Sequence, residues 1–302
     1  MSEPQAPKRT LDRKNLAVRL ASAGVFAVLF FTLLWFGEHP AAKLTFLALL
    51  AGAALLGVRE LVLMARKSGL TPSLGAGALV AWLLLAHFFF HGGMFSAQDP
   101  LPLWLVMILG MVIVHFGGLL FSKDPIEGAL SSQAVTWMAG LLLGLGLGFQ
   151  LKLFMFNQTT VSNTGARLIL ALYLVVWLGD TAAYFVGHGL GRHKLAPRVS
   201  PGKTWEGAVG NLLGNIGGAA LAKATVCRDW SVVDVVAIGL LLGLVGILGD
   251  LAESTWKRSV GVKDSAMGVE IPGHGGILDR MDSLLFAAPA LYAYVHFVHG
   301  LV

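Results

Sequence analysis

The segment 232–282 reads VVDVVAIGLLLGLVGILGDLAESTWKRSVGVKDSAMGVEIPGHGGILDRMD and joins two kinds of sequence. Its first part, residues 232–251, is almost wholly apolar and has about the length of a helix that crosses a bilayer, roughly 20 residues. Residues 249–282 then carry ten charged side chains. Because charge beside membrane helices is costly, this concentration of charge predicts a functional site.

The whole chain has the composition of a membrane protein. Of its 302 residues, 56% are hydrophobic and only 13% are charged, and the mean hydropathy is +0.73. Soluble domains carry about 25% charged residues, so we expect an all-α, polytopic integral membrane protein. We predict about nine transmembrane helices, at residues 16–36, 41–64, 72–90, 103–121, 135–154, 168–186, 207–221, 232–251 and 284–299.

The distribution of basic residues predicts the orientation of these helices. Lys8, Arg9, Arg13 and Lys14 precede the first apolar run, which places the amino terminus in the cytoplasm. Alternating helices then bring two charge-rich segments, 180–206 and 249–282, to the cytosolic side. Loops that face anionic headgroups explain the net charge of +5, so no nucleic-acid partner is expected. The expected location is a bacterial inner membrane, with the site facing the cytosol.

The segment 179–207, GDTAAYFVGHGLGRHKLAPRVSPGKTWEG, has the features of a phosphate-binding loop. Glycines and prolines allow sharp turns, Lys203 supplies positive charge, and Ser200 and Thr204 supply hydroxyls at the start of a helix. It is not a Walker A motif, because Pro197 stands where the first glycine is required. The alternative is a basic loop that only sets topology. The glycines at 144, 146 and 148 predict close helix packing rather than nucleotide binding.

Carboxylates recur at helical spacing in the second charged segment. Asp250 is expected to end an apolar helix, with Glu253, Ser254, Lys257 and Arg258 near the same face. Asp279 and Asp282 form an i, i+3 pair at the start of the last helix. Carboxylates from two helix ends above a basic loop predict a site that holds Mg²⁺ against a polyphosphate. Alternatively, these carboxylates only pair with Lys257, Arg258 and Arg280, and His274 either shapes a loop or acts as an acid or ligand.

Three separated blocks give the chain a resemblance to a known family. They are SPGKTWEG at 200–207, GDLAES at 249–254, and KR, KDS and IPGHGGILDRMDS between 257 and 283. In this order the blocks resemble the phosphatidate cytidylyltransferases, also called CDP-diacylglycerol synthases. Residues 1–165 resemble the family only as apolar helices. We therefore expect N-terminal transmembrane helices in 1–165 and a C-terminal transmembrane catalytic region with cytosolic polar loops in 166–302.

The resemblance implies that phosphatidic acid attacks the α-phosphorus of CTP in a membrane, giving CDP-diacylglycerol and pyrophosphate with Mg²⁺ present. It leaves open a monovalent cation beside Mg²⁺ and a homodimer. The implied catalytic residues are Asp250, Asp279, Lys257 and Arg258, and the implied metal ligands are Asp250, Asp279 and Asp282. The implied substrate-binding residues are Ser200, Lys203, Thr204, Lys263, Asp264, His274 and Arg280.

Two departures from the family's pattern keep alternatives open. Nine residues, 265–273, separate Asp264 from His274, which is a longer spacing than the family's, and Trp256 replaces a smaller aliphatic residue. A paralogue acting on a different lipid phosphate is therefore one alternative. A CTP-dependent lipid kinase of the dolichol type is a second, and it would transfer the γ-phosphate. A transporter is a third, although charges near the bilayer midplane and internal repeats would be expected for it.

Overall fold

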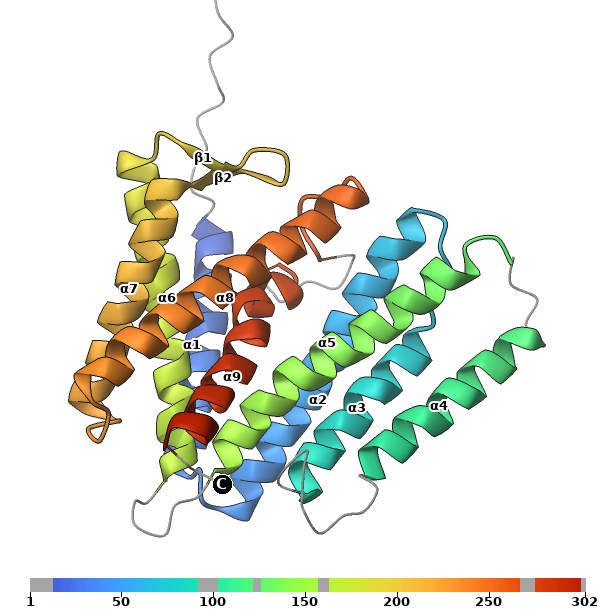
Figure 1. The fold of residues 1–302 in the computed structure, drawn as a ribbon, viewed down its shortest axis with the longest axis horizontal. Coiled ribbons are helices and arrows are strands. Elements are labelled where there is room, and N and C mark those ends of the chain that lie inside the picture. The colour runs from blue at the N-terminus through green and yellow to red at the C-terminus, as the bar shows by residue number, and fades with distance from the viewer. Residues whose placement is uncertain (1–12, 92–102, 122–125, 157–162, 267–274, 300–302) are drawn as a thin grey trace, which may run out of the picture.

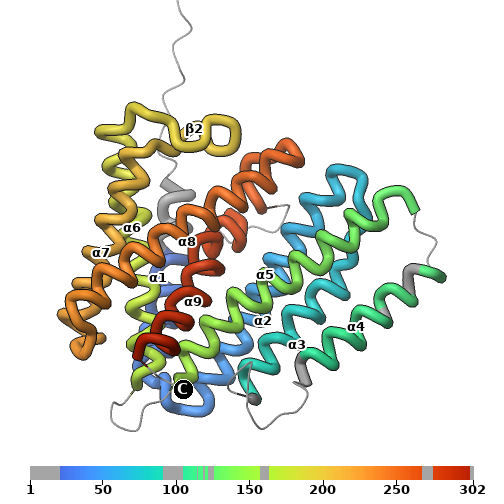
Figure 2. The backbone as a smooth tube through the Cα atoms, viewed as in Figure 1, coloured from blue at the N-terminus to red at the C-terminus, as the bar shows by residue number. Residues whose placement is uncertain are grey.

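The computed structural model describes residues 13–91, 103–121, 126–156, 163–266 and 275–299. Within these ranges the chain forms nine helices and one two-stranded antiparallel hairpin (Figures 1 and 2). The helices are α1 (Arg13–Trp35), α2 (Pro40–Lys67), α3 (Leu74–His91), α4 (Leu103–Leu120), α5 (Ala129–Met155), α6 (Thr164–Leu190), α7 (Trp205–Thr225), α8 (Val232–Ser259) and α9 (Leu278–His299). Each predicted apolar run overlaps one of these helices, which confirms the all-α class.

Five helices are long and apolar enough to cross a membrane, namely α2, α5, α6, α8 and α9. Shorter apolar stretches lie in α1, α3 and α4. By the same criterion α7 does not qualify among the described helices, because polar residues such as Glu206, Asn211 and Asn215 interrupt it. The structure therefore supports a helical integral membrane protein, and the count of about nine spans stays a prediction.

The two charge-rich segments lie at one end of the helical bundle. Strands β1 (Lys194–Ala196) and β2 (Ser200–Thr204) pair antiparallel and connect α6 to α7. Figure 1 shows this hairpin at the same end as the last turns of α8 and the first turn of α9. The turns that connect α1 to α2 and α7 to α8 lie at the opposite end. For the described parts of residues 180–206 and 249–282, the predicted meeting is confirmed.

Glycines allow several of these helices to approach closely. In α7, a Cβ added at Gly218 would lie 2.7 Å from the Cα of Val175 on α6, too close for any larger residue. In α5, a Cβ at Gly144 would lie 2.9 Å from the Cα of Ala81 on α3, and one at Gly146 would lie 2.8 Å from the carbonyl oxygen of Leu285 on α9. The prediction that the glycines of 144–148 serve helix packing is confirmed.

Two helices extend farther than the sequence predicts. Asp250 does not end its helix, because α8 continues about 2.5 turns to Ser259. Asp180 likewise lies nearly three turns before the end of α6 at Leu190. Both carboxylates therefore lie two to three turns before the ends of their helices. The division at residue 165 stays a prediction. Helix α5, which precedes residue 165, packs against α2 on its own side and against α9 on the other side of the division.

Candidate active site

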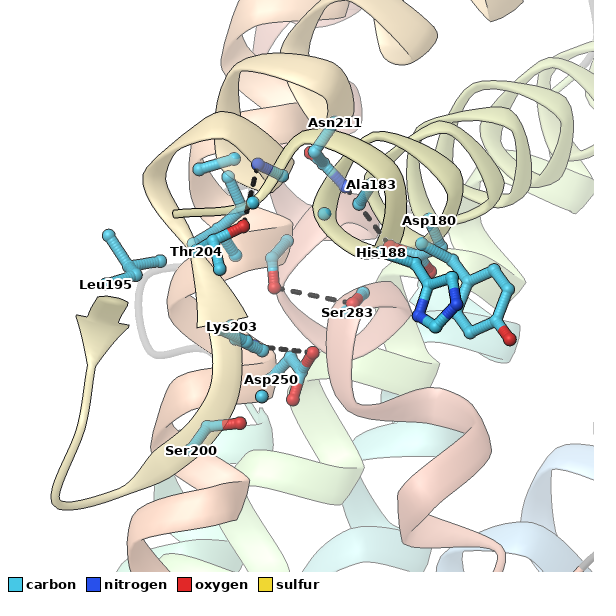
Figure 3. Close-up of a pocket in the computed structure, with 18 of the residues that line it drawn as sticks. Asp180, Ala183, His188, Leu195, Ser200, Lys203, Thr204, Asn211, Asp250 and Ser283 are labelled. Carbon is cyan, nitrogen blue, oxygen red and sulfur yellow. Dashed lines mark hydrogen bonds and ion pairs between the residues drawn. The ribbon is translucent and has the colours of Figure 1, made fainter. Parts of the chain in front are cut away.

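A cavity of about 700 Å³ opens at the hairpin end of the bundle, between α6, the hairpin, α7, α8 and α9 (Figure 3). It combines a basic strand with acidic helix faces. Six of the residues singled out in the sequence line it: Ser200, Lys203, Thr204, Asp250, Asp279 and Asp282. The first three come from β2 and the last three from α8 and α9, so the fold brings the two predicted polar blocks into one site.

Three carboxylates at or directly behind the wall of this cavity are close enough to share a cation: Asp250 and Asp282 line it, and Glu253 is buried next to them. Oxygens of Asp250, Glu253 and Asp282 all lie within 4.8 Å of one another. Glu253 is 1% exposed, and its Oε1 atom has no hydrogen-bond partner among the described residues. A buried carboxylate oxygen without a donor is costly, and a hard divalent cation would satisfy it. The residues therefore fit a divalent metal ion.

Asp279, predicted as a metal ligand with Asp250, has other partners in this structure. Its Oδ1 accepts a hydrogen bond from Nζ of Lys257 at 2.5 Å, and its Oδ2 accepts one from the backbone N–H of Ser265 at 3.1 Å. The same ammonium group of Lys257 lies 2.7 Å from Oε2 of Glu253. Asp279 thus lines the cavity beside the three clustered carboxylates, with Lys257 between it and Glu253.

The charges of the cavity do not balance. Lys203 on β2 reaches across to Asp250, with 2.5 Å between Nζ and Oδ2 (Figure 3). Lys257 is the second ammonium in contact with the cluster. Lys194 also lines the cavity. Five carboxyl groups stand at or behind the cavity wall against these three ammonium groups: Asp180, Asp250, Glu253, Asp279 and Asp282. Carboxyl groups that outnumber the ammonium groups around them favour binding of a cation in place of protons.

The hairpin that carries Lys203 is fixed to the start of α7. Thr204 caps α7, because its Oγ1 accepts a hydrogen bond from the N–H of Gly207 at 3.1 Å. The carboxylate of Glu206 accepts the backbone N–H groups of Arg192 and His193 and contacts the His193 ring at 2.6 Å. Its own backbone N–H and this ring contact lower the pKa of Glu206 to about 2. These bonds hold β2, and hence Lys203, over the cavity.

Other predicted site residues lie outside the cavity. Arg258 is exposed, and its guanidinium donates to the carbonyl oxygens of Val199 and Val262 rather than to a carboxylate. Lys263, Asp264 and Arg280 are exposed near the same end of the bundle. The carboxylate of Asp264 accepts the N–H of Ala266 at 2.8 Å. His274, with most of the longer 265–273 spacing, lies outside the described residues.

Asp180 and Asn211 are cavity residues that the sequence analysis did not select. They come from α6 and α7, and Nδ2 of Asn211 donates to Oδ1 of Asp180 at 3.2 Å (Figure 3). Asp180 lies toward the end of an apolar run, where an ionisable side chain is itself a signal of function. Asn211 carries no charge, so the sequence could indicate it only as a polar residue within an apolar helix.

Comparison with known proteins identifies the family of this chain. The sequence profile of the cytidylyltransferase family matches residues 17–298. The chain belongs to this family. As a family member it is 34% identical over 200 residues to the phosphatidate cytidylyltransferase of Haemophilus influenzae, covering 64% of this chain and 65% of that protein.

Two further relatives carry the same name. The Brucella suis phosphatidate cytidylyltransferase is 38% identical over 200 residues, which cover 63% of this chain and 71% of that protein. The Staphylococcus aureus phosphatidate cytidylyltransferase is 46% identical over 138 residues, which cover 46% of this chain and 52% of that protein. The aligned part of the chain thus spans between about half and 71% of the length of these curated relatives.

Proposed function

We propose that this protein transfers the cytidylyl group of CTP to the phosphate of phosphatidic acid, giving CDP-diacylglycerol and pyrophosphate. A phosphate oxygen of the lipid forms a bond to the α-phosphorus of CTP, and the bond from that phosphorus to the bridging oxygen of the β-phosphate breaks. Membership of the family and the names of the relatives support the reaction. The observation that carries the proposal is the carboxylate cluster at the cavity, which Lys203 of the hairpin contacts through Asp250.

The proposed cofactor is Mg²⁺, which Asp250, Asp282 and Glu253 would hold, with Asp279 next to them. When bound, the ion would neutralise charge on the triphosphate and on the leaving pyrophosphate. Carboxylate oxygens suit Mg²⁺, a hard cation that is usually bound by one or two carboxylates together with phosphate oxygens. The unpartnered Oε1 of Glu253 supports its inclusion beside the residues that the sequence indicates.

The chain's own cations would orient the two anionic substrates. Lys203 now pairs with Asp250, and an incoming triphosphate would compete for its ammonium group. Ser200 adds a hydroxyl along the same wall of the cavity, and the dipole of α7, which begins at Trp205, favours an anion there. Lys257 keeps Glu253 and Asp279 in place from the other side. Holding two like-charged reactants at the reacting distance is a large part of catalysis for such a transfer.

The lipid substrate would reach the cavity from the membrane. Tyr184 on α6 lines the cavity and is 68% exposed, and Phe185 and Leu190 on the same helix are each 67% exposed. These exposed apolar side chains lie on several faces of the last turns of α6 beside the cavity, where acyl chains can pack while the phosphate group enters the polar cavity. We propose that this end of the bundle faces the cytosol from a bacterial inner membrane, so that CTP arrives from the aqueous side.

Labelled CTP tests the reaction directly. The detergent-purified protein is incubated with phosphatidic acid, Mg²⁺ and CTP that carries label at either the α or the γ position. Transfer of the α label to lipid, with the γ label released as pyrophosphate, is the expected result. Transfer of the γ label to lipid would identify a lipid kinase instead. Absence of transfer to phosphatidic acid, but transfer of the α label to another lipid phosphate, would correct the acceptor.

A further inference from the structure

Glu60 is a buried carboxylate in the N-terminal half of the chain, where the sequence resembles the family only as apolar helices. It lies on α2 and is 2% exposed. A buried charge in an apolar helix is costly unless hydrogen-bond donors surround it. Glu60 is not among the residues that line the 700 Å³ cavity, so any part it has in the reaction must act through other residues.

Among the described residues three groups donate hydrogen bonds to Glu60, and all three come from the segment that leads into α9. Its Oε1 accepts the backbone N–H of Ile277 at 2.8 Å. Its Oε2 accepts the backbone N–H of Leu278 at 2.9 Å and the hydroxyl of Ser265 at 3.0 Å. The first N–H groups of a helix have no partner within the helix, and a carboxylate there is favoured by the helix dipole. Glu60 therefore binds the start of α9 from a different helix.

The contacts of Glu60 continue to the carboxylates of the site. The backbone N–H of Ser265 donates to Oδ2 of Asp279, which directly follows Leu278. Asp282 lies one turn farther along α9 and belongs to the carboxylate cluster. Fixing Ser265 and Leu278 together thus fixes the direction in which α9 begins, and with it the placement of Asp279 and Asp282.

The backbone around Glu60 is shaped for this close approach. A Cβ added at Gly276 would lie 2.0 Å from Oγ of Ser265 and 3.0 Å from Oε2 of Glu60. Gly275 adopts a φ of +78°, in the left-handed region that favours glycine. The two glycines let the chain pass against the carboxylate, so three donors from residues 265–278 can reach one side chain.

We propose that Glu60 is a positioning residue for the carboxylate site: it holds the Ser265 segment and the first turn of α9 so that Asp279 and Asp282 face the cluster. The expected effect on transfer rests on the proposed function, whereas the expected effect on the start of α9 does not. A carboxylate is required because both oxygens accept backbone N–H groups. A glutamine would turn its NH₂ group toward one of these donors and lose that bond.

Glu60→Gln in the full-length, detergent-purified protein tests this role. The matched control is Glu127→Gln, the same change at an exposed carboxylate in the turn before α5. We expect the Mg²⁺ concentration for half-maximal transfer to rise about 10-fold or more in Glu60→Gln, as for other residues that orient ligands, with a fall in kcat and little change in KM for CTP. Amide hydrogen exchange at Ile277 and Leu278 should accelerate, and Glu127→Gln should match the wild type in both measurements.

Two measurements keep the test decisive. Both are made without substrate: hydrogen exchange, and Mn²⁺ binding measured from the signal of the free ion. They therefore report on Glu60 even if the wild type transfers no cytidylyl group. In that case only the proposed function fails. Should Glu60→Gln fail to fold, Ser265→Ala decides, since it removes one donor and keeps both backbone bonds. Unchanged exchange at 277–278 and unchanged Mn²⁺ affinity in the variant that folds would overturn the proposal.

Discussion

Lys257 and Arg258 are neighbours in the sequence and have different environments. The ammonium group of Lys257 lies between Glu253 and Asp279, and its side chain is 11% exposed. Arg258 is exposed and donates to two carbonyl oxygens, of Val199 beside the hairpin turn and of Val262 just past the end of α8. Lys257 thus compensates buried negative charge, and Arg258 ties the hairpin turn to the end of α8.

Replacing each of the two by methionine should separate these roles. Lys257→Met leaves two largely buried carboxylates without their cation, which we expect to cost about 3–5 kcal/mol and most of the activity. Arg258→Met removes exposed hydrogen bonds to carbonyl oxygens and should cost about 1 kcal/mol, with a partial loss of activity. Thermal unfolding in detergent and transfer of the α label measure both. Equal losses in the two variants would contradict the assignment.

Asp250 offers a direct test of the cation site. Asp250→Asn keeps the size of the side chain but removes a charge from the cluster and releases Lys203. We expect kcat/KM to fall by about 100-fold or more, because charge stabilisation of the transferring phosphoryl group is usually a dominant contribution. Asp229→Asn, at an exposed carboxylate between α7 and α8, is the control. A fully active Asp250→Asn protein would show that the cluster does not serve the transfer.

At the scale of single elements, α8 shows which features hydropathy can predict. Its apolar part, 232–251, was predicted from composition, because burial in lipid requires that pattern. Its last turns were missed because they carry the charged residues of the site. They are helical owing to good helix formers such as Ala252 and to the i, i+4 pair of Glu253 and Lys257. Helix type was therefore predictable, and the position of Asp250 within the helix was not.

The glycines of α7 permit a test of helix packing by two adjacent positions. Gly218 faces α6, and an added Cβ would lie 2.7 Å from the Cα of Val175. Gly217 has no atom within 4 Å of an added Cβ. Gly218→Ala should lower stability by about 1–3 kcal/mol through overpacking. Gly217→Ala should be neutral or stabilising by up to about 1 kcal/mol, since alanine favours the helix. The melting temperatures of the two variants are measured in the same detergent. An equal shift in both variants would contradict the close contact between α7 and α6 at Gly218.

At the scale of the whole molecule, the sequence predicted the meeting of residues 180–206 and 249–282 but not the contribution of α2. The meeting follows from the positions of the charged residues and from the alternation of helices across the membrane, and both can be recognised in the local sequence. The contact between Glu60 and Leu278 joins positions 218 residues apart, and no local pattern encodes such a pairing. Asp180 was visible as a charge, whereas its place in the cavity depends on how α6 packs against α7.

The orientation of the bundle can be measured by cysteine labelling. The native Cys227 is 4% exposed, and burial raises the pKa of its thiol to about 12, so it should react slowly. Arg198→Cys lies in the hairpin turn and Asp229→Cys at the opposite end, both at exposed positions. In intact bacterial cells a membrane-impermeant maleimide should label Asp229→Cys only. Labelling of Arg198→Cys alone would show that the hairpin end faces the outside, which is the opposite orientation.

The depth of the carboxylates has a consequence for kinetics. Asp180 and Asp250 lie between two and three turns before the ends of α6 and α8, a distance on the order of 15 Å along each helix axis. A phosphate group can meet them there while its acyl chains stay among neighbouring lipids. The enzyme would then encounter this substrate by diffusion in two dimensions. Its rate should follow the mole fraction of phosphatidic acid in the bilayer or micelle, and diluting that surface with inert lipid should slow turnover even when the amount of substrate in the tube is unchanged.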